Sequence, residues 1–293
     1  MSEKSQRRLW YTLFVLPTFV LFALFFAYSV IKVFYTSFCE WKLRTPVTFI
    51  GLGNYVKLFT TDLDFTVAVK NTAWWVFLQS TLHVSFGLII ALLLFRKPRG
   101  WKVFRTSYFI PNVISVSAKA LMFSSLLNPT YGPVNQLIRV FIPSFDHNWL
   151  FNPHTAVFSV QMGWLLYAGM IMVMLMAEIV NIPGEIIDAA RIDGASWFAI
   201  DIRIIIPLLR NALGTCVLLA STSMLREFEF IYIATGGGPG NMTMNLPLLV
   251  YKQAMKNNNY GYANAVGSLL ILLGIAFVII VNKSFRMGES DMY

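Results

Sequence analysis

Apolar residues occur along the chain in runs of membrane-spanning length, separated by shorter polar links. Because about 20 consecutive apolar residues cross the hydrocarbon core of a bilayer, we predict six spans. They are Trp10–Phe38, Asn71–Phe95, Thr106–Leu127, Thr155–Val180, Asn211–Thr235 and Tyr260–Asn282. The links predict two further short helices, one within residues 39–70 and one at Val134–Phe141. The pattern is that of an all-α membrane protein with six transmembrane helices.

Composition supports a membrane location. Apolar residues make up 57% and charged residues 13% of the chain, and the mean hydropathy is +0.62. A soluble domain carries about 25% charged residues. The net charge of +9 needs no nucleic-acid partner, because basic loops beside a membrane face anionic lipids.

Basic residues set the orientation. Thirteen of them fall on one side of a six-span topology: Lys4, Arg7, Arg8, Arg96, Lys97, Arg99, Lys102, Arg105, Arg191, Arg203, Arg210, Lys283 and Arg286. The positive-inside rule places that side in the cytoplasm. We therefore expect both termini to be cytoplasmic, with residues 1–9 as an N-terminal segment and residues 10–293 as a single transmembrane domain.

The polar segment Asn181–Arg210 is the most informative part of the chain. It is too polar to span a bilayer, and its charges alternate with Ile, Ala and Leu at helical spacing. The pattern breaks at Asp193–Gly194, and Pro207 is expected to end it. We predict two short amphipathic helices joined by a tight turn. On the cytoplasmic side of a membrane protein, such an elbow offers a docking surface to another protein.

No motif indicates chemistry carried out by the chain itself. It has no phosphate-binding G-x-x-x-x-G-K-[ST] loop, and the glycine run at 236–240 lacks the Lys and Ser/Thr. The histidines His83, His147 and His154 lack metal-ligand spacing, so we expect structural roles for them. We therefore expect no enzyme activity, no metal and no cofactor of its own.

Two blocks of sequence resemble one family. The first block resembles the EAA loop, at about residues 181–210, of membrane subunits of bacterial ATP-binding-cassette importers: Ile182–Pro183, Ile187–Ala190, Ile192–Ser196, Ile204 and Pro207–Leu209. The second resembles the first of the two permeases of carbohydrate importers such as the maltose and glycerol-phosphate systems: Phe228–Glu229, Ile231–Tyr232, Thr235–Pro239, Tyr251, Tyr260–Ala263 and Ala265. The resemblance implies the type I importer permease fold in the bacterial cell membrane.

The resemblance also implies a set of partners. These are a second, non-identical permease, a cytoplasmic ATPase dimer that binds ATP and Mg, an extracytoplasmic solute-binding protein and the sugar. The residues that it assigns to coupling with the ATPase are Glu185, Asp188, Ala189, Ala190, Asp193, Gly194, Ala195 and Pro207. Similar chains usually have Glu at the position of Asp188 and often an aromatic residue near that of Asp201. Because Asp201 is an acid, we expect Trp197 or Phe198 to supply the hydrophobic contact with the ATPase that an aromatic residue there would make.

Polar and aromatic residues within the spans predict a substrate pathway. An ionisable group inside a span costs about 2.5–3.5 kcal/mol on insertion scales, so it usually faces a cavity or a partner. The candidates, partly by resemblance, are Gly163, Trp164, Tyr167, Met170, Ala220, Met224 and Glu227. In a continuous helix Gly163, Tyr167 and Met170 would share one face. The alternatives are helix-packing aromatics in span four and an ion pair of Glu227 with Arg226 or Lys119.

The main functional hypothesis is a permease subunit for a sugar or oligosaccharide. Glycerol phosphate or a polyol is the alternative substrate. An ion-coupled secondary transporter is the alternative from another class, and it would require inverted repeats and paired broken helices, neither of which the sequence shows. A channel or scaffold without coupling is the third possibility.

Overall fold

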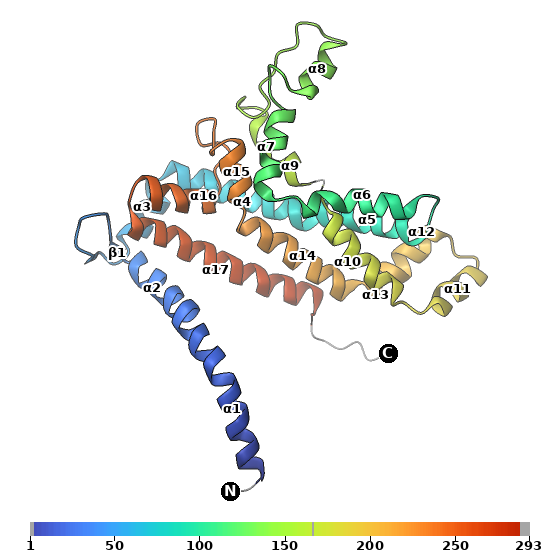
Figure 1. The fold of residues 1–293 in the computed structure, drawn as a ribbon, viewed down its shortest axis with the longest axis horizontal. Coiled ribbons are helices and arrows are strands. Elements are labelled where there is room, and N and C mark those ends of the chain that lie inside the picture. Colours follow the sequence, from blue (N-terminus) through green and yellow to red (C-terminus); the bar gives the residue numbers. More distant parts are fainter. Residues whose placement is uncertain (1–2, 166, 288–293) are drawn as a thin grey trace. The chain divides into compact units, whose positions relative to one another are not determined.

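The computed structural model describes residues 3–165 and 167–287. The chain forms two compact units, which are described separately. The first unit comprises Met1–Asp62 and Leu249–Ile271, and the second comprises Leu63–Leu248 and Leu272–Tyr293. In both units almost all regular structure is helical (Figure 1).

The first unit contains the predicted first span. Its elements are α1 (Glu3–Phe22), η1 (Ala23–Ala27), α2 (Tyr28–Ser37), β1 (Cys39–Glu40), β2 (Thr48–Phe49), α3 (Gly53–Thr60), η4 (Lys252–Lys256) and the first part of α17 (Tyr260–Phe285). The helix Trp10–Ser37 is long and apolar enough to cross a membrane, and none of its most apolar window is buried within the chain. Its surface is therefore available to lipid or to another subunit.

Hydrogen bonds of polar side chains join α3, the short helix predicted within residues 39–70, to other parts of the first unit. The Asn54 amide donates to the carbonyl oxygens of Ser37 (2.8 Å) and Cys39 (2.9 Å). The Tyr55 hydroxyl lies 2.8 Å from the Ser268 hydroxyl of α17. The strands β1 and β2 pair antiparallel over two residues each, which is an exception to the all-α prediction.

The second unit contains the remaining helices. They are α4 (Leu63–Leu78), η2 (Gln79–His83), α5 (Val84–Phe95), α6 (Trp101–Val113), α7 (Val116–Leu126), α8 (Pro133–Arg139), α9 (Ala156–Leu165), α10 (Gly169–Val180), α11 (Gly184–Ile192), α12 (Trp197–Ile200), η3 (Asp201–Ile205), α13 (Ile206–Leu208), α14 (Arg210–Leu225), α15 (Glu229–Ala234) and the end of α17. The helix α16 (Leu246–Tyr251) begins in this unit. Helices α5 and α10 pack along each other.

The helices bend sharply at two places, once within predicted span three and once just before predicted span five. Among the described residues, four helices qualify as single spans, or up to six if each bent pair is one span. Helices α6 and α7 meet at 103°, and Trp197–Leu208 meets Arg210–Leu225 at 73°. At the first break the extended Ser115 caps α7, because its hydroxyl accepts a hydrogen bond from the Ala118 N–H at 3.3 Å. Predicted span three is therefore not one straight helix.

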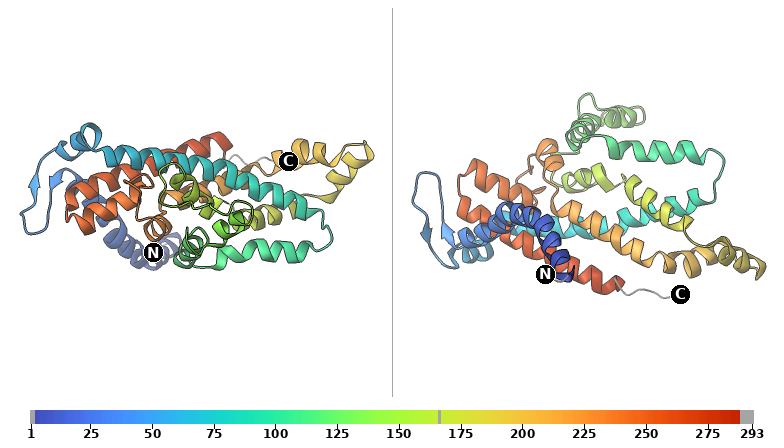
Figure 2. Two further views of the ribbon diagram at one scale, coloured as in Figure 1. Left: turned by 90° about the horizontal axis from the view of Figure 1, so that it is seen from above. Right: turned by 60° about the horizontal axis from the view of Figure 1, so that its bottom comes forward.

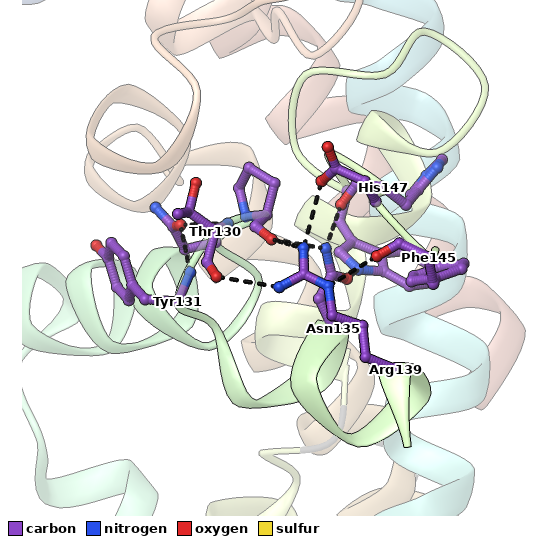
Figure 3. Close-up of polar contacts among 10 residues, drawn as sticks. Thr130, Tyr131, Asn135, Arg139, Phe145 and His147 are labelled. Atoms are coloured by element: carbon purple, nitrogen blue, oxygen red, sulfur yellow. Dashed lines mark hydrogen bonds and ion pairs between the residues drawn. The ribbon is translucent and has the colours of Figure 1, made fainter. Parts of the chain in front are cut away.

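The link between α7 and α9 folds around α8, close to the helix predicted at Val134–Phe141. Figure 3 shows Arg139 donating to three backbone carbonyl oxygens, those of Pro129 (2.8 Å), Thr130 (3.2 Å) and Phe145 (2.8 Å). Asn135 is fully buried and donates to the His147 carbonyl oxygen at 2.9 Å. These bonds satisfy carbonyl groups that no helix pairs, so the link has a fixed shape.

The core of the second unit lies between α5, α10 and α14. Its buried side chains include Leu92, Met172, Leu175 and Ile179. At Gly87 of α5 a Cβ atom would lie 2.6 Å from Ile171 of α10, so the two helices touch closely because this residue has no side chain. The cluster also contains buried residues of the polar segment, which fastens that segment to the helices.

Replacement of Gly169 by Ala is expected to destabilise the second unit. A Cβ there would lie 2.7 Å from the Tyr108 carbonyl oxygen and 3.0 Å from the Phe109 Cα, and backbone atoms cannot move aside cheaply. Overpacking of this kind costs about 1–3 kcal/mol. Gly267→Ala is the matched control, because nothing lies within 4 Å of its Cβ position. Thermal midpoints of the solubilised protein should fall for Gly169→Ala alone; equal midpoints would contradict this packing.

Candidate functional site

The predicted elbow folds as two helices joined by a tight turn. Helix α11 ends at Ile192, and Gly194 follows with a φ of +79°. The Ala195 N–H donates to the Ala190 carbonyl oxygen (2.9 Å), and the Gly194 N–H donates to that of Arg191 (3.1 Å). This is the Schellman arrangement that ends a helix with a left-handed residue. The prediction from the Asp193–Gly194 break is confirmed.

The next helix begins directly after the turn. Ser196 is extended, and its hydroxyl accepts a hydrogen bond from the Ala199 N–H at 3.3 Å, which caps α12. Helical backbone then continues through η3 and α13. Pro207 is expected to end this segment, and the helix ends one residue later, at Leu208. The bend of 73° follows at Leu209.

Most of the predicted coupling residues lie on the surface of the elbow. The exposed ones are Glu185, Asp188, Ala189, Asp193, Gly194 and Pro207. Ala190 and Ala195 are half-buried and pack against the apolar core. The buried side chains of Ile187 and Ile200 hold the two helices in place from below. Figure 1 and both views of Figure 2 show the elbow at the end of the second unit where α10 ends.

The elbow also exposes large apolar side chains. Ile192 is 87% exposed and Phe198 is 73% exposed. Both flank the Gly194 turn, and the acidic residues Asp188 and Asp193 lie close to them in the sequence. Exposure of such large apolar side chains to water is unfavourable, and a partner protein would bury them.

Asp201 lies inside the elbow rather than on its surface. Its carboxylate forms an ion pair with Arg96, which directly follows α5. Burial raises the pKa of the Asp201 carboxyl above its usual value, although the Arg96 guanidinium acts in the opposite direction. The Trp197 ring contacts the guanidinium groups of both Arg96 (5.2 Å from the guanidinium carbon to the ring centroid) and Arg191 (5.1 Å). Phe198 is thus the more exposed of the two aromatics expected to contact the ATPase.

The candidate pathway residues of span four do not lie on one continuous helix. Gly163 and Trp164 belong to α9 and Met170 belongs to α10, whereas Tyr167 and Ala168 are not helical. The predicted shared face of Gly163, Tyr167 and Met170 is therefore wrong. The break is stabilised by α6, because the Tyr108 hydroxyl hydrogen-bonds to the backbone of Ala168.

Trp164 takes part in an aromatic cluster. Its ring meets those of Trp75 (5.3 Å between centroids) and Phe230 (5.2 Å) edge to face. A Cβ at Gly163 would lie 2.1 Å from the Phe230 ring. These two residues therefore serve helix packing in this conformation, as the alternative interpretation of span four expected.

The other pathway candidates differ in accessibility. Met170 is 51% exposed, whereas Ala220 and Met224 are only 4% and 3% exposed. The Tyr167 ring faces the Lys119 ammonium, 5.5 Å from the ring centroid. Met170 and Tyr167 thus offer surface to a passing molecule, and Ala220 and Met224 offer almost none in this conformation.

Glu227 lies where span five is interrupted, between α14 and α15. Its carboxylate accepts a hydrogen bond from the Phe230 N–H at 3.0 Å and so caps α15. Its carbonyl oxygen accepts one from the Asn245 amide. Nearby, the Ser117 hydroxyl of α7 donates to Glu229. Neither Arg226 nor Lys119 forms an ion pair with Glu227 within 4.0 Å among the described residues.

The sequence does not indicate which residues hold Asp201 and Trp164 in place. The ion pair of Arg96 and Asp201 joins residues 105 positions apart, and no local pattern indicates it. The same holds for Phe230 and Trp75, which surround Trp164. The acid at position 201, in a stretch that is apolar except for Asp201 and Arg203, is the signal that the sequence offers.

Comparisons with known proteins agree with this architecture. Residues 83–286 match the family described as binding-protein-dependent transport system inner membrane component. The probable ABC transporter permease protein YurN of Bacillus subtilis is 33% identical over 95% of this chain and 97% of its own length. The multiple sugar-binding transport system permease protein MsmF of Streptococcus mutans is 31% identical over 96% and 97%.

A solved structure shows the same fold. A chain of the bacterial alginate ABC transporter, in complex with an alginate pentasaccharide-bound periplasmic protein, superposes with a TM-score of 0.84 at 20% identity, over 97% of this chain and 96% of that one. The family match covers more than half of this chain, including the elbow and both sharp bends. The chain belongs to the binding-protein-dependent transport system inner membrane components, the permease subunits of ABC transporters.

Proposed function

We propose that this chain is the transmembrane subunit of an ATP-driven importer that passes a sugar or oligosaccharide from an extracytoplasmic binding protein across the bacterial cell membrane. The observation that carries the proposal is the elbow, with its exposed Ile192 and Phe198 beside a fixed turn. The name of MsmF, a multiple sugar-binding transport system permease protein, supports a sugar as the substrate.

The proposed assembly contains two cytoplasmic ATPase subunits, which bind ATP and Mg, and a second, non-identical permease. The apolar surface of Trp10–Ser37, unburied within the chain, leaves room for such a neighbour. The alginate transporter is described in complex with a periplasmic protein, which supports delivery by a separate binding protein. Both termini and the elbow then lie in the cytoplasm, as the basic residues indicate.

In this proposal the ATPase moves the elbow, and the elbow moves the helices to which it is fastened. Its acidic and apolar surface docks on the ATPase through Glu185, Asp188, Ile192, Asp193 and Phe198. Buried Ile187 and Ile200 join that surface to the core of α5 and α10. A rigid-body displacement of a docked element is a common way to shift a protein between two packed states.

The test is purification from native membranes through a tag on this chain. Mass spectrometry should find an ATPase subunit and a second permease. In liposomes, ATP hydrolysis should rise several-fold when the binding protein is added with one member of a panel of maltose, raffinose, arabinotriose, alginate trisaccharide and glycerol 3-phosphate. Stimulation by glycerol 3-phosphate alone would support the alternative substrate. Uptake driven by an ion gradient, with no ATPase subunit present, would contradict the proposal.

A further inference from the structure

Four charged or aromatic side chains meet where the elbow joins the helices. Arg96 directly follows α5, Arg191 lies in the last turn of α11, Trp197 opens α12 and Asp201 opens η3. The Arg96 guanidinium pairs with the Asp201 carboxylate, and both arginines stack near the Trp197 ring. Arg96, at the end of α5, thus contacts the second helix of the elbow through Asp201. The Trp197 ring also links Arg96 to Arg191 of the first helix.

The ion pair is largely shielded from water. The Asp201 side chain is 13% exposed and that of Arg96 is 31% exposed. A carboxylate this buried would, without its cation, keep a desolvation penalty that nothing offsets. A guanidinium–carboxylate pair is also directional, whereas the apolar contacts beneath it are not.

We propose that the Arg96–Asp201 pair, with the Trp197 ring in contact with both Arg96 and Arg191, is a clamp that makes the elbow and α5 move as one body. This inference rests on the proposed function, because it concerns how displacement of the elbow by an ATPase reaches the spans. Helix α10 runs directly into the elbow, and the clamp adds α5, which packs along α10, to the parts that move with it. Arg96 and Asp201 are positioning residues, and neither touches the sugar.

Spin labels can measure whether the clamp holds. Labels at Leu93 of α5 (53% exposed) and Ile186 of α11 (42% exposed) are placed in the complete transporter after Cys39 and Cys216 are replaced by Ser. Distances are recorded without nucleotide and after trapping with MgATP and vanadate. The variants are Asp201→Asn, Arg96→Gln and the exchanged pair Arg96→Asp with Asp201→Arg. Arg99→Gln, which removes an exposed basic residue from the same link, is the matched control.

With the native pair and in the control, one narrow distance should appear, and its mean should change by less than about 2 Å on trapping, as expected of a rigid body. In each single variant the distribution should become at least about twice as broad, as for a segment that moves independently. The exchanged pair should restore the narrow distribution. Equal widths in all variants, or a broad distribution with the native pair, would overturn the clamp.

If the single variants fail to assemble, the exchanged pair decides the test. A narrow distance distribution in that variant supports the clamp, and a broad distribution overturns it. The proposed function fails in a different way, because it predicts an ATPase subunit in the complex with the native pair. Absence of that subunit would appear before any variant is compared. Failure of the clamp alone would appear as unaltered widths in an intact, hydrolysing transporter.

Discussion

Gly194→Glu is expected to abolish sugar uptake while the chain still inserts into the membrane. Gly194 has a φ of +79°, and an added Cβ would meet no atom of the chain within 4 Å. The backbone strain is therefore modest, about 1–2 kcal/mol for a side chain in the left-handed region. The larger effect comes from a charged side chain that projects from the turn into the docking surface. Sugar uptake by cells measures transport, and the amount of the protein in membranes measures insertion.

Gly194→Asn is the matched control for this prediction. Asn tolerates the left-handed conformation better than other residues do, and it adds no charge. It should keep most of the uptake, and the ATPase should co-purify with it but not with Gly194→Glu. Normal uptake in the Glu variant would count against a docking role for the turn.

Glu227→Ala is expected to lower uptake by about tenfold or more, because hydrogen bonds to charged groups contribute about 1.5–3 kcal/mol. The variant loses both the cap on α15 and the carboxylate predicted to face the substrate pathway. Assembly with the ATPase should remain intact, since the elbow is unaltered. Uptake rates and co-purification check the two expectations.

Glu227→Gln separates the two roles of this residue. Gln keeps an oxygen that can accept from the Phe230 N–H, so α15 should stay capped and the thermal midpoint should stay near that of the wild type. We expect its uptake to remain reduced, because the negative charge is lost. Arg226→Gln, a change at an exposed neighbour, should transport normally. Wild-type uptake by Glu227→Gln would assign Glu227 to capping alone.

Local chemistry made the elbow predictable. Helical spacing of Ile and Ala, followed by Asp193–Gly194 and Ser196, specifies a helix end and the next helix start through backbone bonds that span only a few residues. The short helices α3 and α8 were indicated for the same reason. Pro207 marks the end of the second elbow helix to within one residue, because proline lacks the N–H that a helix interior needs.

The breaks in the spans could not be predicted from hydrophobicity. Hydropathy averages over about a bilayer thickness, so the runs across Ser115, Tyr167 and Glu227 appear continuous. Each break is stabilised by groups that must be known in three dimensions, such as the Tyr108 hydroxyl at Ala168 and the Asn245 amide at Glu227. The assumption that span four was one helix produced the wrong shared face. Broken helices had also been expected of a secondary transporter, and the family match decides that question.

The central claim is that a separate ATPase docks on the elbow, and site-specific crosslinking in cells tests it most directly. A photoreactive phenylalanine at Ile192, which is 87% exposed, should form a light-dependent adduct with an ATPase subunit. The same group at Leu137 of α8, which is 68% exposed, should not. An Ile192 variant that inserts normally yet crosslinks only to lipid, or to no protein, would contradict the claim.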